Sequence, residues 1–373
     1  MSDDARRRRR AKQARRDARR IRAQQEEAFE EVPEETPLID EVRHALATDH
    51  PLDLLALVGV LLEATTQDPL AFANPDAPES VNIDDLITGF IGVQIPETTA
   101  LLGVLVELLD DAALATRCRE ELAAREDAPP EWVTRLPEVE IRRVTRMTHV
   151  LGEGDEVVIG ARLADGAELT CAVHVDHTWS SQVSDAFILP VSIDEMVAVA
   201  QEHNTDPDTT FVEMDPADAR AWVEYGIEQA EKIMVLKRSD TWPACRPLLR
   251  WLLHHMPEGG QRYQPPRLSG GQAAELFDEF FSGHATKFAD QDHRELLEDI
   301  AFDTGTGDPL RWSAGRIEEV LNRPTDTDSG VSTQCLLDLP DLLRAFVPFA
   351  HARSGIRDEL TAEALAVLDE PSP

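Results

Sequence analysis

The sequence predicts a mainly helical α+β protein with an N-terminal helical bundle, an antiparallel β-meander and a larger C-terminal helical domain. Apolar residues recur at helical spacing through residues 36–127 and again beyond residue 205. Residues 138–204 instead hold alternating, β-rich runs, two of them joined by Asp165-Gly166, which is typical of a hairpin. With 373 residues and 42% hydrophobic content, the chain can supply the cores that these parts need.

Residues 1–35 are predicted to be an arm that is disordered or transiently helical, basic at first and then acidic. Residues 1–22 contain 11 Lys and Arg and 3 Asp and Glu, a net charge of +8. The rest of the chain contains 25 Lys and Arg and 68 Asp and Glu, a net charge of −43. The arm has few large apolar side chains, so it can bury little surface on its own.

Residues 36–127 are predicted to form the helical bundle. The runs PLDLLALVGVLLEATT and ETTALLGVLVELLDDAALATRCREELAAR have the apolar spacing of helices. The segment EDAPPEWVTRLPE follows with three prolines, which is typical of a linker.

Residues 138–204 are predicted to form the antiparallel meander, with one helix in it. The run VEIRRVTRMTHVL alternates, and DEVVIGARLADGAELTCAVHV holds two strands around Asp165-Gly166. A helix is expected from Ser192 to about Glu202, because Ser192 with Glu195 three residues later forms a capping box.

Residues 205–373 are predicted to form the C-terminal helical domain. Its first helix is expected after Asp215, with Pro216 at the first helical position. Further helices are expected at about 243–256, 270–282, 292–302, 313–322, 338–352 and 359–369.

Charge and composition narrow the function classes. The acidic body repels phosphate backbones and anionic lipids, so any contact with nucleic acid is expected to run through the arm. No stretch approaches ~18 uninterrupted apolar residues, and we expect a cytoplasmic protein without membrane contact. The cysteines form no C-x-x-C pair and are expected to be reduced, mostly buried thiols: Cys118, Cys171, Cys245 and Cys335. No cofactor is predicted.

The basic arm is the main candidate for binding. Its Arg and Lys side chains can pair with phosphates and release counterions, which favours nucleic acid or the ribosome as partner. Docking on an acidic protein surface, the chain's own or a partner's, is a second interpretation, and a solubilising tail is a third. The residues concerned are Arg6, Arg7, Arg8, Arg9, Arg10, Lys12, Arg15, Arg16, Arg19, Arg20 and Arg22.

The string HVDH, His174 to His177, is the candidate metal site. On a strand His174 and Asp176 share one face, and His177 at the strand end can turn toward them. The string resembles the H-x-H-x-D-H motif of metallo-β-lactamase-like hydrolases, with Ala172 in the place of the first histidine. The alternative interpretation is a strand end in which Asp176 and His177 fix the turn through local hydrogen bonds.

Asp185 is a candidate partner that would orient His177 as a general base. Ser180, Ser181 and Ser184 lie nearby in the sequence, but none is in a G-x-S-x-G elbow, and a structural Asp–His contact is the alternative. The stretch GDPLRWS lacks the pattern of a phosphate-binding loop and is expected to be a loop in which Ser313 begins a helix.

Three stretches, VHVDHTWSSQVSDAFILP, GDPLRWSAGRIEEVL and LLRAFVPFAHARSGIRDELTAEALAVLDE, resemble segments of uncharacterised actinobacterial proteins. The resemblance covers residues 140–373, and it implies a source and a domain layout but no activity.

The sequence therefore favours a non-enzymatic cytoplasmic interaction protein. Its helical domains would serve a protein partner, and its arm would contact nucleic acid, the ribosome or an acidic surface. The rival class is a metal-dependent hydrolase that uses His174, Asp176, His177 and Asp185.

Overall fold

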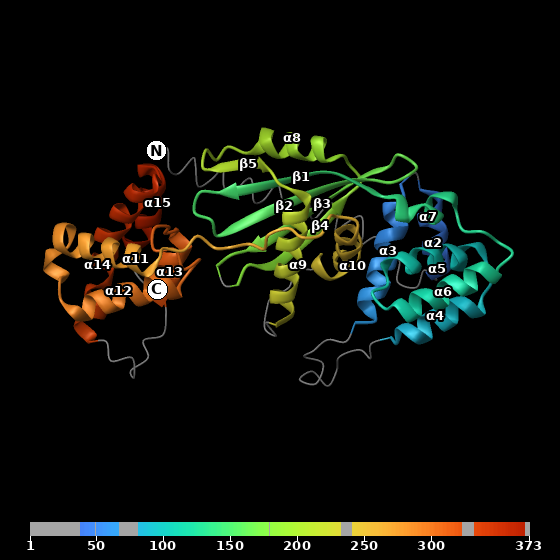
Figure 1. Ribbon diagram of the computed structural model, residues 1–373, viewed down its shortest axis with the longest axis horizontal. Helices are drawn as coiled ribbons and strands as arrows, with labels where there is room; N and C mark the ends of the chain where they lie inside the picture. The colour runs from blue at the N-terminus through green and yellow to red at the C-terminus, as the bar shows by residue number, and fades with distance from the viewer. Residues whose placement is uncertain are drawn as a thin grey trace. The chain divides into compact units, whose positions relative to one another are not determined.

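The computed structural model describes residues 38–48, 50–66, 81–178, 180–232, 241–322 and 332–369 (Figure 1). Two compact units are distinguished, Met1–Asp49 and His50–Pro373. In the first unit the structure describes α2, Leu38–Ala47, and the predicted arm lies outside the described residues. The second unit contains many helices and one antiparallel sheet, which confirms the predicted fold class.

The helices predicted for the N-terminal bundle are present. They are α3 Leu52–Ala64, α4 Ile83–Gly92, α5 Pro96–Leu108, α6 Ala112–Ala124 and the short α7 Glu131–Thr134, followed by the 3₁₀ turn Leu136–Glu138. Side-chain caps begin two of them: Asn82 accepts from the backbone of α4, and Asp111 accepts from the backbone of α6. At the end of α6, Arg125 donates to the hydroxyls of Thr98 and Thr99 and closes the bundle.

The sheet has five antiparallel strands in the order β4-β3-β2-β1-β5. The strands are β1 Glu140–His149, β2 Gly154–Arg162, β3 Glu168–Asp176, β4 Gln182–Leu189 and β5 Thr209–Glu213. The Asp165-Gly166 turn joins β2 to β3, and Gly166 has a φ of +95°, which a residue with a side chain rarely adopts. The meander and its hairpin are therefore as predicted.

One strand was not predicted. β5 lies in the stretch from residue 205 onward that the sequence predicts to be helical, and it pairs with β1 from Thr145↔Glu213 to His149↔Thr209. Its five residues, TTFVE, are rich in β-branched and aromatic side chains, but the run is too short for its alternation to stand out.

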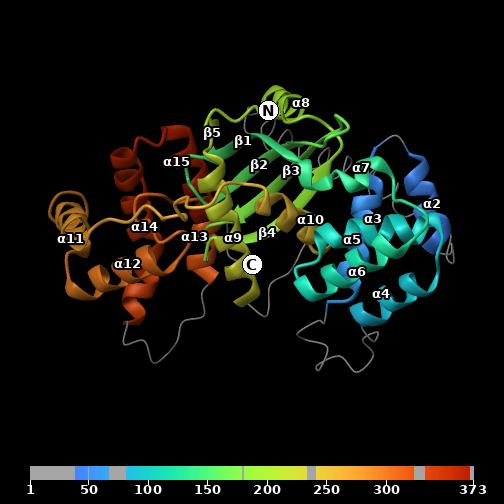
Figure 2. The same ribbon diagram turned by 45° about the vertical axis from the view of Figure 1, so that its right-hand side comes forward.

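Three helices cover the sheet (Figures 1 and 2). α8, Ile193–His203, is capped by Ser192 as predicted, and Ile193 packs where Gly160 has no side chain. α9, Pro216–Lys232, and α10, Trp242–His254, contact β4, and α10 also packs against α3. α9 thus packs on the sheet, and α10 packs on both the sheet and the bundle.

The last helices share a core of their own. They are α11 Gly270–Glu279, the π-turn Phe280–His284, the 3₁₀ turn Thr286–Phe288, α12 Gln291–Asp303, α13 Ala314–Asn322, α14 Thr333–Ser354, α15 Asp358–Leu365 and the 3₁₀ turn Ala366–Asp369. Several aromatic side chains lie in this core, among them Phe277, Phe280, Trp312 and Phe346. None of the described helices has the length and apolarity that crossing a membrane requires.

Candidate functional site

The first histidine of the HVDH string pairs with a carboxylate of the neighbouring strand. His174 on β3 lies opposite Glu156 on β2, and its Nδ1 is 2.8 Å from Glu156 Oε1. The hydrogen bond to Glu156 raises the pKa of His174 above 6.5. The ring lies over Gly154, where a Cβ would be 2.9 Å from the imidazole.

Asp176 and the backbone of His177 shape the turn after β3. The Asp176 carboxylate accepts from the backbone N–H of Thr178 at 2.8 Å and from its hydroxyl at 2.6 Å. The His177 backbone N–H donates to the carbonyl of Glu153 at 2.8 Å. These contacts are those of a hydrogen-bonded strand end, the second of the two interpretations that the sequence allows.

The side chain of His177 pairs with Asp155 in the interior. Nε2 donates to Asp155 Oδ2 at 3.0 Å, and the two side chains are 1% and 4% exposed. Burial raises the pKa of Asp155, but hydrogen bonds from His177 and Thr148 and the charges of His177 and Arg146 outweigh it, so the pKa is lowered below 3.8.

An aromatic pair from later in the chain covers this imidazole. Tyr263 stacks on His177 with ring centroids 3.9 Å apart, and Trp222 meets it edge-on at 6.3 Å. Burial and the charge of Asp155 raise the pKa of Tyr263 to about 12, so the phenol stays protonated. His177 therefore anchors the segment that carries Tyr263 to the sheet.

The predicted partner of His177, Asp185, has a different contact. Its Oδ1 accepts from the hydroxyl of Thr241 at 2.6 Å, next to the start of α10, and in the sheet it lies opposite His174. The carboxylates that hold the two histidines are thus Asp155 and Glu156, which the sequence reasoning missed. The Asp165-Gly166 turn contained the signal, because extending that hairpin residue by residue pairs Glu156 with His174.

The arginines and the lysine proposed as the anionic-partner site, Arg6 to Arg22, lie outside the described residues. The four cysteines are unpaired thiols, buried at Cys118, Cys171 and Cys335 and half-buried at Cys245, in agreement with the expectation.

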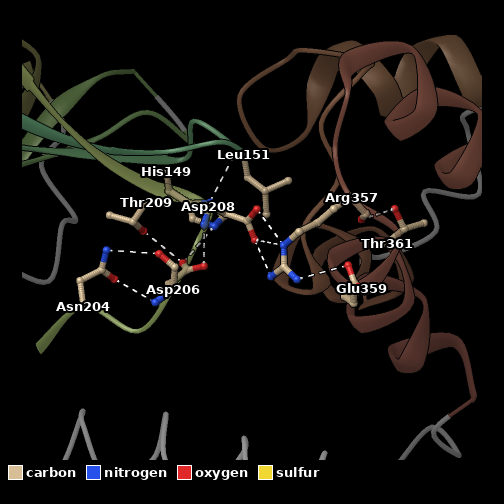
Figure 3. A network of polar contacts seen from close by, with 9 residues as sticks. All are labelled: His149, Leu151, Asn204, Asp206, Asp208, Thr209, Arg357, Glu359 and Thr361. Carbon is tan, nitrogen blue, oxygen red and sulfur yellow. Dashed lines mark hydrogen bonds and ion pairs between the residues drawn. The ribbon is translucent and has the colours of Figure 1, made fainter.

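Two groups of side chains in the described part of the chain have metal-ligand spacing, and neither contains His174, Asp176 or His177. One is Asp290, His293 and Cys335; the other is His149, Asp206 and Asp208. In the second group, shown in Figure 3, His149 Nδ1 accepts from the backbone of Leu151 at 3.2 Å. Asp206 accepts from the backbone of Asp208 at 3.0 Å, so these ligand atoms already shape a loop.

The same group is tied to the last helices by an arginine. Arg357, the N-cap of α15, donates from Nε to both carboxylate oxygens of Asp208 at 2.8 and 2.7 Å (Figure 3). Both carboxylate oxygens of Asp208 therefore accept hydrogen bonds from Arg357, which indicates that the network has a structural role.

A buried arginine shapes the loop before α13. Arg316 donates to the carbonyls of Ala301, Asp308 and Arg311 and lies 4.0 Å from the ring centroid of Trp312. Burial lowers its pKa to about 10, so it stays charged at neutral pH. As the sequence predicts, GDPLRWS is a loop ending in a cap: Ser313 accepts from the Arg316 backbone at 2.9 Å.

This loop borders a cavity of about 880 Å³. Gly305 and Gly307, both in the left-handed region, lie on one side of it, with Thr178 and Arg267 also in its wall. Asp303 and Glu319 add two carboxylates, which gives the cavity an acidic rather than a phosphate-binding character.

No protein-family model, curated protein or solved structure matches this chain.

Proposed function

We propose that this chain is a non-enzymatic interaction protein that holds a polyanionic partner through its basic arm, and nucleic acid, free or in the ribosome, is the partner class that we favour. The observation that carries the proposal is the reversal of charge within one chain. Residues 1–22 have a net charge of +8, whereas the remainder has a net charge of −43. A polyanion would approach the arm and be repelled by the body.

The ion pairs of the body support this division. Several of its arginines each bridge two carboxylates: Arg143 pairs with Asp194 and Glu213, and Arg250 pairs with Asp110 and Glu231. Guanidinium groups engaged in this way offer little to an incoming phosphate. Residues 1–22 of the arm hold 11 of the 36 Lys and Arg, so several of them can contact phosphates of one polyanion.

The contacts of the histidine cluster are consistent with a body that serves as a scaffold. His174 and His177 pair with Glu156 and Asp155 of β2, and Asp176 fixes the turn through Thr178. The covering segment is held by the stacking of Tyr263 on His177. Each of these contacts contributes to folding, so the proposal assigns the cluster to stability and the arm to binding.

Binding to three polyanions tests the proposal and its alternatives. We would compare single-stranded RNA, duplex DNA and polyglutamate, with the full chain and a variant in which Arg6–Arg10 are glutamine. RNA or DNA bound by the full chain and weakened at least about tenfold in the variant supports the proposal. Binding of polyglutamate alone would replace nucleic acid by an acidic protein surface, and binding of none of the three would contradict the proposal.

The rival hydrolase makes an opposite prediction about His177. If His174, Asp176 and His177 held a catalytic metal, the purified protein would contain about one equivalent, and His177→Ala would remove it from a folded chain. We expect His177→Ala to lower the stability of the chain without changing its metal content, because the substitution removes the hydrogen bond from His177 to the buried Asp155 carboxylate.

A further inference from the structure

The other group with metal-ligand spacing lies where α12 and α14 begin. Asp290 is the N-cap of α12, His293 lies in its first turn, and Cys335 lies in the first turn of α14. His293 Nδ1 is 2.7 Å from Asp290 Oδ2 and 3.7 Å from Cys335 Sγ. One imidazole nitrogen therefore faces a carboxylate and a thiol at the same time.

This group is buried but has an opening to solvent. Cys335 is 3% exposed and His293 is 6% exposed, whereas the side chain of Asp290 is 55% exposed. His293 Nε2 is buried and has no hydrogen-bond partner among the described residues, and Asp338 Oδ2 lies 3.4 Å from it as a charged neighbour. A buried nitrogen without a hydrogen-bond partner costs free energy. This cost is lower if the ring proton is held on Nε2, where it faces the Asp338 carboxylate.

We propose that Asp290, His293 and Cys335 form a zinc site that joins α12 to α14. Carboxylate oxygen, imidazole nitrogen and thiolate sulfur are the zinc ligands of proteins, and a thiolate disfavours magnesium and calcium. The three ligand atoms lie within 4.8 Å of one another, so they can surround one ion after small side-chain rotations. The proposal does not rest on the function assigned to the arm.

The neighbouring groups suit a zinc-bound histidine. With Nδ1 on the ion, the ring proton is on Nε2 and faces Asp338, the arrangement in which a carboxylate orients a metal-bound imidazole. The Ser332 hydroxyl donates to Cys335 Sγ at 3.1 Å, which stabilises a thiolate. Asp290 and Cys335 lie at the positive ends of their helices, where negative ligands are favoured. The exposed side of Asp290 leaves a fourth position for water.

Cobalt titration of the full chain tests the site, because thiolate ligation of Co²⁺ gives a charge-transfer band in the near ultraviolet. We expect one equivalent of Co²⁺ to produce the band and Zn²⁺ to displace it. Cys335→Ala should abolish the band. Asp290→Asn should weaken binding at least about tenfold, while asparagine still caps α12.

Two substitutions serve as matched controls. Asp111→Asn changes the N-cap of another helix, α6, and Cys118→Ala removes another buried helical thiol. Both variants should bind Co²⁺ as the parent chain does. If Cys335→Ala fails to fold, the exposed Asp290→Asn variant decides. A folded parent chain that gives no band, or an Asp290→Asn variant that binds as tightly as the parent, would overturn the proposal.

Discussion

At the scale of single residues, the buried ring of His351 makes stability depend on pH. It is 0% exposed, and its Nε2 accepts from the backbone of Trp312 at 3.1 Å while its Nδ1 lies 2.9 Å from the Thr361 hydroxyl. Nε2 therefore has no proton, and Nδ1–H donates to Thr361. Burial lowers the pKa of His351 from 6.5 to about 4, because a charged ring would lose its hydration.

The consequence is a loss of stability in mild acid. A pKa that folding depresses adds stability above about pH 6.5, and this stability is lost as the pH falls toward 4. Between pH 7 and pH 5 we expect His351 to lower the free energy of unfolding by about 2 kcal/mol, as measured with urea. His351→Gln should remove this part of the pH dependence, whereas the exposed His203→Gln should not. An unchanged slope in His351→Gln would contradict this account of the ring.

Asp155 and Glu156 are adjacent carboxylates whose substitution is expected to lower stability by different amounts. Asp155→Asn replaces the buried carboxylate that pairs with His177 by a neutral amide, so it should cost about 2 kcal/mol of unfolding free energy. Glu156→Gln changes the half-exposed pair with His174 and should cost less than about 1 kcal/mol. Denaturation at pH 7 measures both, and equal effects would be incompatible with the burial that separates the two pairs.

The depressed pKa of Asp155 adds a second pH dependence. Its contribution is present above pH 3.8, the ordinary pKa of the group, and is lost as the pH falls through the lower folded value. Asp155→Asn should therefore flatten the unfolding free energy below about pH 4. If the unfolding free energies of the parent chain and the variant fell in parallel below about pH 4, the pKa of Asp155 would not be lowered by its surroundings.

The sequence predicted the local contacts of these residues better than the distant ones. Asp176 and His177 were correctly placed at a strand end because an Asx turn depends on neighbouring residues. Asp155 and Tyr263 could not be assigned to His177 in this way. Asp155 is 22 residues away on another strand, and Tyr263 comes from a segment with no regular periodicity.

At the scale of elements, the segment between α10 and α11, residues 255–269, crosses α9, and we call it the strap. Gly260 lies against the backbone of Ala217, and the backbone of Gln261 donates to Asp218 at 2.7 Å. Tyr263 then reaches His177. The strap thus brings together residues of α9 and the end of β3, and the rings of Tyr263 and Trp222 exclude water from the buried pair beneath.

Gly260 lies so close to α9 that the strap has no space for a side chain at this position. A Cβ there would lie 2.0 Å from the carbonyl oxygen of Ala217, a backbone atom that cannot turn aside. Gly260→Ala should therefore cost about 1–3 kcal/mol in thermal or urea unfolding. Gly271→Ala, in the first turn of α11 with no atom within 4 Å, should be neutral or stabilising. A neutral Gly260→Ala would mean that the strap is not held against α9.

Helix periodicity predicted the helices and not their partners. It located α9 and α10 correctly, but it could not show that both contact β4 or that α10 packs against α3, because an apolar stripe shows that a face is covered and not which element covers it. α14 begins at Thr333, earlier than the expected residue 338, and it continues through Pro340. That proline lies inside the helix, whose start is fixed by Ser332 accepting from the backbone of Cys335.

At the scale of the whole molecule, charge is the property that most constrains function. Residues 1–22, the basic part of the arm, have a net charge of +8, whereas residues 23–373 have a net charge of −43. Under the proposed function, the basic part attracts a polyanion and the acidic remainder repels it. Deleting residues 1–22 should therefore leave the thermal unfolding of the body unchanged while removing polyanion binding, which calorimetry and a binding titration would check.

The most direct test is the salt dependence of nucleic-acid binding by the full chain and by a version that lacks residues 1–22. We expect that only the full chain binds, and that the logarithm of its affinity for duplex DNA falls with the logarithm of salt concentration at a slope of about −4.5, as for five phosphate contacts. Equal binding by the two versions, or no binding by either at low salt, would contradict the assignment of the arm to nucleic acid.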